Sequence, residues 1–196
     1  MAKEEKGQLI LRGLAEARKF FEQVSLLIRT AEEMLEENGW KPDTNSNKSS
    51  DISSHLLKPD EWMPRWVSRF FKSDEHIDLL LYIGVLLDQT GGWAGFREPW
   101  VTCGLFQYLP EKIEMSEDWE LEWVTAHLDQ KRDPDGSFYE CAYELEEQES
   151  EGILREWTMA LPLIEIGNAE ELKRKFIEPL LNQVNKISQE NIKSKA

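Results

Sequence analysis

The sequence contains few cysteines, few histidines and no long apolar run. Among its 196 residues are 2 cysteines and 3 histidines, and no apolar stretch reaches the roughly 18 residues that a membrane-spanning helix needs. The two cysteines, Cys103 and Cys141, are too few for a disulfide framework, and a single bridge between them is left open. The sequence therefore argues against a disulfide-rich secreted scaffold and predicts no membrane partner.

Positive charge is also in short supply. The chain has 23 Lys and Arg residues against 38 Asp and Glu residues, a net charge of −15. Residues 111–156 alone hold 16 acidic and 4 basic residues, a net charge of −12. Because binding to nucleic acid requires basic side chains that neutralise phosphates, we expect no nucleic-acid partner. The acidic segment is interpreted as a solvated face, and a basic protein partner is the functional alternative.

The overall composition indicates a folded protein. Hydrophobic residues make up 40% and charged residues 31% of the chain, which includes 8 Trp and 8 Phe. The length fits a single domain, residues 1–196. The first residues lead into an amphipathic segment rather than into the apolar core of a signal peptide, so we expect a cytoplasmic protein.

A long amphipathic helix, at about residues 8–38, is the clearest predicted element. Its apolar residues recur at alternating steps of four and three, which places them on one stripe of a helix. The stripe consists of Ile10, Leu14, Ala17, Phe21, Val24, Ile28, Ala31 and Leu35. Asn38 and Gly39 then provide a left-handed stop. We expect the helix to pack lengthwise across a sheet, with a coiled-coil arm as the alternative.

The middle of the chain predicts a loop followed by strands. Residues 41–54 contain almost no apolar side chain and many Ser and Asn residues, which indicates a flexible polar loop. Within the strand region 65–166, strands are predicted at 65–72, 76–88, 100–109, 137–146 and 153–166. The run 76–88 is almost continuously apolar, as expected for a central strand covered on both faces. Pro162 in the last run favours an edge position or a bulge.

Two further segments complete the predicted fold. Residues 117–130 are ambiguous, because their acidic start favours a helix slightly whereas their alternating apolar residues suit a strand. A C-terminal helix at about 169–188 begins with the N-cap Asn168, and Pro179 should kink or break it. The predicted class is α+β, with an antiparallel sheet of about five strands, a meander, packed against the long N-terminal helix and the C-terminal helix.

The sequence carries no motif for metal binding or catalysis. The histidines, His55, His76 and His127, are isolated, with no His-Glu-x-x-His or Cys-x-x-Cys spacing, so we expect neither a metal nor a cofactor. Residues 133–136 are interpreted as a type I turn rather than as part of a calcium loop. The two cysteines lie in apolar strand contexts, where they are expected to be core residues.

The Gly-rich segment 90–97 is the most distinctive local feature. It precedes a proline and a strand and carries no lysine, unlike a phosphate-binding loop, which opens a helix. Its residues Trp93, Phe96 and Arg97 are candidates for a partner-binding tip or for the lip of a pocket. The plain interpretation is a hairpin loop whose aromatic side chains lie in the core.

The predicted strand 137–146 has an acidic outer face. Glu140, Glu144 and Glu146 alternate along it and are candidate residues of an acidic interaction face. Together with the absence of catalytic motifs, this face favours a non-enzymatic intracellular protein-interaction module. Such a module would be an acidic adaptor, inhibitor or chaperone-like accessory that contacts a protein through its sheet, and a homodimer through the long helix is left open.

Two other classes of function are carried as alternatives. The first is a small-molecule-binding sensor domain, suggested by a helix-covered meander with an aromatic, Gly-rich loop. The second is an enzyme whose site is dispersed over the strands, which rests on the presence of 2 cysteines and 3 histidines.

Overall fold

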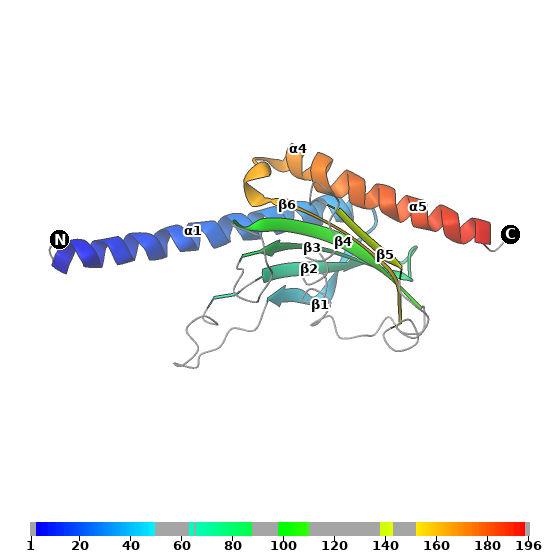
Figure 1. Ribbon diagram of the computed structural model, residues 1–196, viewed down its shortest axis with the longest axis horizontal. Coiled ribbons are helices and arrows are strands. Elements are labelled where there is room, and N and C mark those ends of the chain that lie inside the picture. The colour runs from blue at the N-terminus through cyan, green and yellow to red at the C-terminus, as the bar shows by residue number, and fades with distance from the viewer. Residues whose placement is uncertain are drawn as a thin grey trace.

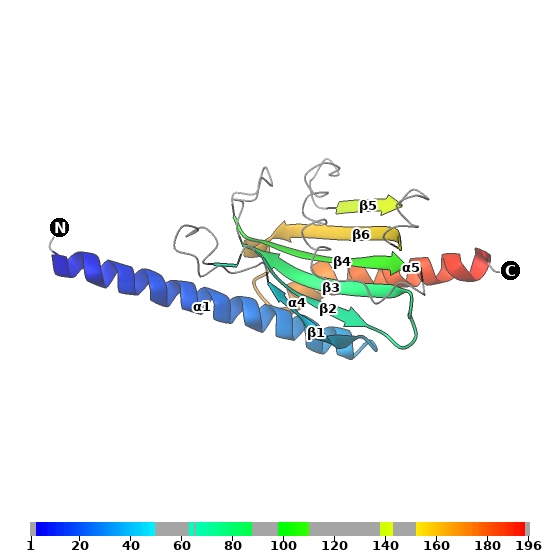
Figure 2. The same ribbon diagram turned by 90° about the horizontal axis from the view of Figure 1, so that it is seen from below.

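A computed structural model describes residues 3–49, 63–64, 66–87, 98–109, 138–142 and 152–194. In this part of the chain, a six-stranded antiparallel sheet carries an N-terminal and a C-terminal helix on one face (Figures 1 and 2). The arrangement confirms the predicted α+β class and its antiparallel sheet.

The order of strands in the sheet is β1-β2-β3-β4-β6-β5, and each neighbouring pair is antiparallel. The strands are β1 (Lys41–Ser49), β2 (Trp66–Lys72), β3 (Leu79–Leu86), β4 (Trp100–Tyr108), β5 (Phe138–Ala142) and β6 (Ile153–Pro162). The first four strands follow one another as a meander. The last two depart from chain order, because β6 lies between β4 and β5.

Strand β3 is buried along its whole length. Leu81, Ile83 and Val85 belong to the core under the helices. Successive side chains of a strand alternate between the two faces of a sheet, so Leu80 and Tyr82 point to the opposite face. Both are also buried. The prediction of a central strand covered on both faces is therefore confirmed.

Helix α1 (Lys3–Glu36) forms the N-terminal element. A 3₁₀ turn, η3 (Leu163–Glu165), leads from β6 into the C-terminal helix. That helix consists of α4 (Ala169–Leu172), the π-helical turn η4 (Lys173–Ile177) and α5 (Glu178–Ser194). The core between helices and sheet includes Val24, Ile28, Ala31 and Leu35 of α1 and Leu172, Phe176, Ile177, Leu180, Val184 and Ile187 of the C-terminal helix.

The start of the C-terminal helix follows the sequence prediction, and its proline is accommodated. Asn168 is the N-cap, since its Oδ1 accepts a hydrogen bond of 2.9 Å from the backbone N–H of Glu171. Pro179 lies at the beginning of α5 and does not end the helix. The wider turn η4, in which the N–H of Glu178 donates to the carbonyl of Lys173, comes directly before it. Such a turn suits a proline, which lacks an N–H and crowds the carbonyl four residues earlier.

Residues 41–49 form strand β1, where the sequence predicts a flexible loop, so that prediction is wrong for this segment. Strand β1 pairs with β2 from Lys41 opposite Lys72 to Ser49 opposite Val67, with a register shift between Pro42 and Asn47. The pairing uses backbone groups, which a polar sequence supplies as well as an apolar one. The edge position also tolerates a proline and an irregular register.

Pro162 is the last residue of β6 and ends the strand. Strand β6 lies inside the sheet, so the predicted edge position is not found. After Pro162 the chain turns, and the backbone N–H of Leu163 donates to the carbonyl of Pro99 at 2.8 Å. The ambiguous segment 117–130 lies outside the described residues.

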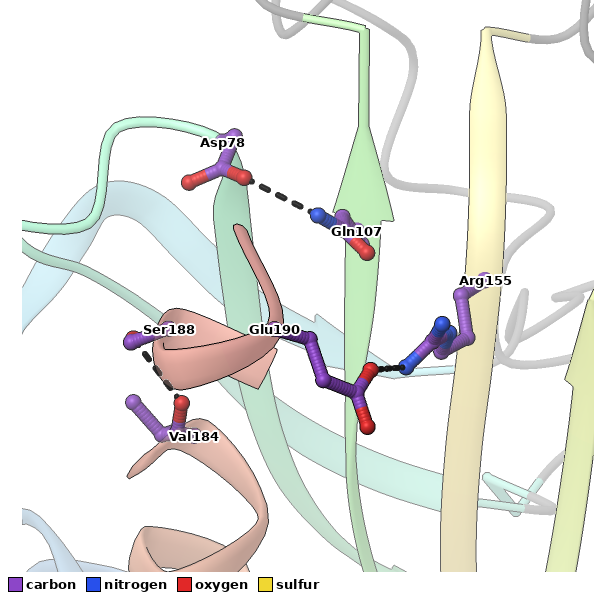
Figure 3. A network of polar contacts seen from close by, with 6 residues as sticks. All are labelled: Asp78, Gln107, Arg155, Val184, Ser188 and Glu190. Atoms are coloured by element: carbon purple, nitrogen blue, oxygen red, sulfur yellow. Dashed lines mark hydrogen bonds and ion pairs between the residues drawn. The ribbon is translucent and has the colours of Figure 1, made fainter. Parts of the chain in front are cut away.

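An ion pair joins the end of α5 to the sheet, and a second polar contact joins two neighbouring strands beside it (Figure 3). Arg155 of β6 donates a hydrogen bond of 2.7 Å to Glu190 of α5. On the next strand, Gln107 Nε2 donates to Asp78 Oδ2 at 3.1 Å. These contacts and the core beneath them show that the face of the sheet under the helices is already occupied by this chain.

Candidate functional site

Helix α1 is covered along only part of its length. Its stripe is buried from Val24 to Leu35, but the N-terminal half extends beyond the sheet (Figures 1 and 2). We call residues 7–19 of α1 the arm. The large apolar residues of the arm are exposed: Leu9 by 60%, Ile10 by 63%, Leu11 by 68% and Leu14 by 63%. Isolated exposed apolar residues are ordinary, but a contiguous group on one element marks a surface for association.

The base of the arm carries two phenylalanines beside an apolar pocket. The rings of Phe20 and Phe21 meet edge to face, with centroids 5.7 Å apart and an interplanar angle of 74°. A pocket of about 260 Å³ opens between α1 and the turn that leads from β6 into α4. Its apolar lining includes Phe20, Val24, Leu27, Leu163, Ile166 and Leu172, with Gln23, Thr30 and Asn168 as polar members. The exposed apolar surface of the arm thus continues into a hollow at its base.

A polar cluster lies on the opposite face of the sheet. The Tyr82 hydroxyl is 2.8 Å from Thr158 Oγ1, and Thr158 Oγ1 donates to Glu156 Oε1 at 3.1 Å. Because the single hydroxyl proton of Thr158 goes to the carboxylate, Tyr82 donates to Thr158. All three side chains are buried. The cluster is a short relay of hydroxyl groups that ends on a buried carboxylate.

The hydroxyl of Tyr82 stays neutral across the physiological pH range. Burial, followed by the nearby charge of Glu156, raises the pKa of Tyr82 well above its ordinary value, because both disfavour the phenolate. Burial likewise raises the pKa of the Cys103 thiol, and this side chain is fully buried. The thiolate is the nucleophilic form of cysteine, so the raised pKa makes Cys103 a poor nucleophile. Its full burial makes it a core residue, as its sequence context predicted.

Beside this cluster, small residues cross the same face of the sheet. Ser68 lies opposite Gly84, Gly84 opposite Thr102, and Thr102 opposite Ala160. We call these four residues the small-residue row. Within the described part of the chain, no hydrogen-bond partner is found for the buried Ser68 Oγ, nor for the buried Nε1 of the nearby Trp66. Unpaired buried polar atoms are costly, so this row is the second candidate site.

The site residues proposed from sequence are mostly not placed. Trp93, Phe96 and Arg97 lie outside the described residues, as do Glu144 and Glu146. Glu140 is described only by its backbone, in edge strand β5 opposite Trp157. The loop and the acidic face therefore stay predictions.

His76 packs beside a tryptophan rather than standing alone on the surface. Its ring stacks on Trp40, with centroids 5.5 Å apart and an interplanar angle of 8°, and its Nδ1 lies 3.4 Å from Ser188 Oγ. Among the residues that the structure describes, no group of three His, Cys, Asp or Glu side chains is arranged to hold a metal ion.

The sequence revealed the stripe of α1 but not where it is covered. A signal was present in the lengths: 34 helical residues span about 51 Å, whereas the 10 residues of β6 span about 34 Å. A helix this much longer than the strands extends beyond them. The small-residue row gave no such signal, because it joins single residues from separate strands.

Comparison with known proteins found no protein similar to this chain. Neither protein-family models, nor curated proteins, nor solved structures gave a match to this chain. Within the described residues, no helix combines the length and the apolar character needed to cross a membrane. The arm, its basal pocket and the small-residue row are therefore the features that indicate a function.

Proposed function

We propose that this chain is a non-enzymatic, cytoplasmic protein-interaction module that binds its partner through the arm of α1. The observation that carries the proposal is the exposure of Leu9, Ile10, Leu11 and Leu14 on a helix that projects from the sheet. A helix with one apolar face suits a partner that presents an apolar groove or a second helix.

The expected gain on binding is substantial. Burying the exposed part of each of these leucine and isoleucine side chains contributes about 1 to 2 kcal/mol. Four such residues supply enough free energy to offset part of the entropy cost of association. The apolar pocket at the base of the arm offers further area for the same partner.

The arm replaces the sheet as the proposed contact surface. On the described strands, the helix-covered face is filled by this chain, and the side chains of the opposite face, such as Phe70, Phe106 and Tyr108, are buried. The acidic segment 111–156 then serves a separate purpose in the proposal. Its net charge of −12 favours solubility and the approach of a basic protein partner.

The proposal is tested by photo-crosslinking from within the arm. A benzophenone amino acid is placed at Leu11, and a matched control at Glu33, which is exposed on the covered half of the same helix. We expect covalent adducts to a protein from Leu11 and none from Glu33. Equal labelling from both positions, or no adduct from either, would contradict a binding role for the arm.

A small-molecule-binding domain is the second candidate function, favoured by the small-residue row. The unpaired Trp66 Nε1 is a hydrogen-bond donor and the unpaired Ser68 Oγ is both donor and acceptor, so a small polar ligand would satisfy both. Native mass spectrometry of the purified protein is expected to show an added mass that is lost in a Ser68→Val variant. A bare polypeptide mass at all ligand loads would argue against this function.

A further inference from the structure

We infer that the partner of the arm is a second copy of this chain, and that two arms pair antiparallel about a two-fold axis near Ala17. The inference rests on the proposed function, because it assumes that the arm is the binding surface. Two features of α1 support it: the period of its apolar stripe and the position of its glycine beside that stripe.

The stripe has the period of a helix that packs on another helix. Ile10, Leu14, Ala17 and Phe21 follow one another at steps of four, three and four, which is the spacing of a coiled-coil seam. The same spacing continues into Val24 and the buried half of α1. The seam of the arm is therefore the continuation of an interface that this chain already uses, at the point where its own sheet ends.

No close contact within the described part of the chain requires a glycine at position 13, and the same is true of Gly7 nearer the N-terminus. A Cβ atom at this position would meet nothing within 4 Å, yet glycine inside a helix costs about 1 kcal/mol relative to alanine. Gly13 borders the seam, and the small residue Ala17 lies within it. A close approach by a second helix would account for the absence of a side chain.

Pairing about Ala17 places large residues against small ones. Residue 21 of one copy then lies level with residue 13 of the other, and residue 20 with residue 14. The Phe20–Phe21 pair of each copy therefore faces the gap beside Gly13 and the exposed Leu14 of its partner. A parallel pairing would instead set each phenylalanine against itself and each glycine against itself, leaving clashes and voids.

In the antiparallel pairing, Leu9 of the second copy also lies beside the pocket at the base of the arm. Leu9 precedes Phe20 by 11 residues and Leu27 by 18 residues, which are about three and five helical turns, so the three lie on one flank of α1. A two-fold axis keeps that flank on the same side in both copies. Leu9 of one copy then lies level with residue 25 of the other, beside the pocket that Phe20 and Leu27 line. Closed two-fold dimers of this kind are the commonest protein oligomers.

The oligomeric state is tested by sedimentation velocity over a range of concentrations. We expect the wild-type chain to be a dimer, a Leu14→Glu variant to bind itself at least about 100-fold more weakly, because it places two buried carboxylates in the seam, and a Gly13→Leu variant to be monomeric. Ala15→Glu is the matched control, since Ala15 is exposed and faces away from the seam, and it should remain dimeric. Circular dichroism checks that each variant keeps the wild-type fold.

The direction of pairing is tested by disulfide trapping. An Ala17→Cys variant is expected to form a covalent dimer, because the two copies of residue 17 meet at the axis. An Ile10→Cys variant should not, whereas a parallel pair would trap at both positions. A wild-type chain that stays monomeric up to high micromolar concentration would overturn the inference, as would a monomer whose arm binds phospholipid vesicles. If that monomer still forms adducts from Leu11 with another protein, the proposed function stands and only the second copy is excluded.

Discussion

Replacing Gly104 with alanine is expected to lower the free energy of unfolding by about 3 kcal/mol or more. An added Cβ would lie 2.6 Å from Tyr82 Cε1 and 2.7 Å from the Tyr82 hydroxyl oxygen, and it would also collide with the carbonyl oxygen of Trp157. The tyrosine cannot move aside freely, because its hydroxyl is held by Thr158. The carbonyl belongs to the backbone of β6, so relief requires a shift of the sheet itself.

Urea unfolding of the Gly104→Ala variant measures this loss. The matched control is Gly7→Ala, since a Cβ at Gly7 would meet nothing within 4 Å and alanine favours the helix. The control should change stability by less than about 1 kcal/mol. A loss below 1 kcal/mol for Gly104→Ala would mean that β4 and β6 do not approach one another as described.

Replacing Phe176 with alanine is expected to cost about 3 to 5 kcal/mol of stability. Phe176 is fully buried in the core between the helices and the sheet, and its backbone carbonyl lies 4.0 Å from Cys103 Sγ. It belongs to the π-helical turn η4, where the C-terminal helix packs over β4. Removal of the ring leaves a cavity that the rigid sheet below cannot fill.

Thermal or urea unfolding of Phe176→Ala provides the measurement, with Ile164→Ala as the control. Ile164 is also a large apolar residue near the C-terminal helix, but it is 79% exposed, so its truncation should cost less than about 0.5 kcal/mol. Equal effects from the two substitutions would contradict the packing of the C-terminal helix on the sheet. The expected loss from Phe176→Ala is a large share of the total, because domains are stable by only about 5 to 15 kcal/mol.

Several elements were accessible from sequence because their signals are local. The stripe of α1 is a repeat within one segment, and its prediction needed no knowledge of what covers it. The run at β3 is apolar on both faces, which indicated a strand in the middle of a sheet before any neighbour was known. Asn168 was found as an N-cap because the capping hydrogen bond joins residues only three positions apart.

Other features depended on partners far along the chain. Strand β1 has no apolar alternation, and it exists because β2 offers backbone groups for it to pair with. The place of β6 between β4 and β5 depends on its pairing with both strands, and β4 lies more than 40 residues earlier in the chain. The small-residue row runs from Ser68 to Ala160 across two intervening strands. No spacing within a single segment of the sequence predicts such a row.

The sequence by itself determined that α1 has one apolar face, that the strands are antiparallel and mainly buried, and that the charge is concentrated in residues 111–156. Only the tertiary structure decided which half of that face is covered. The physical reason is that periodicity records which side of a helix is apolar, whereas coverage depends on where the sheet ends. Because burial of the stripe begins at Val24, the first half of the stripe is left for a partner and the second half holds the fold together.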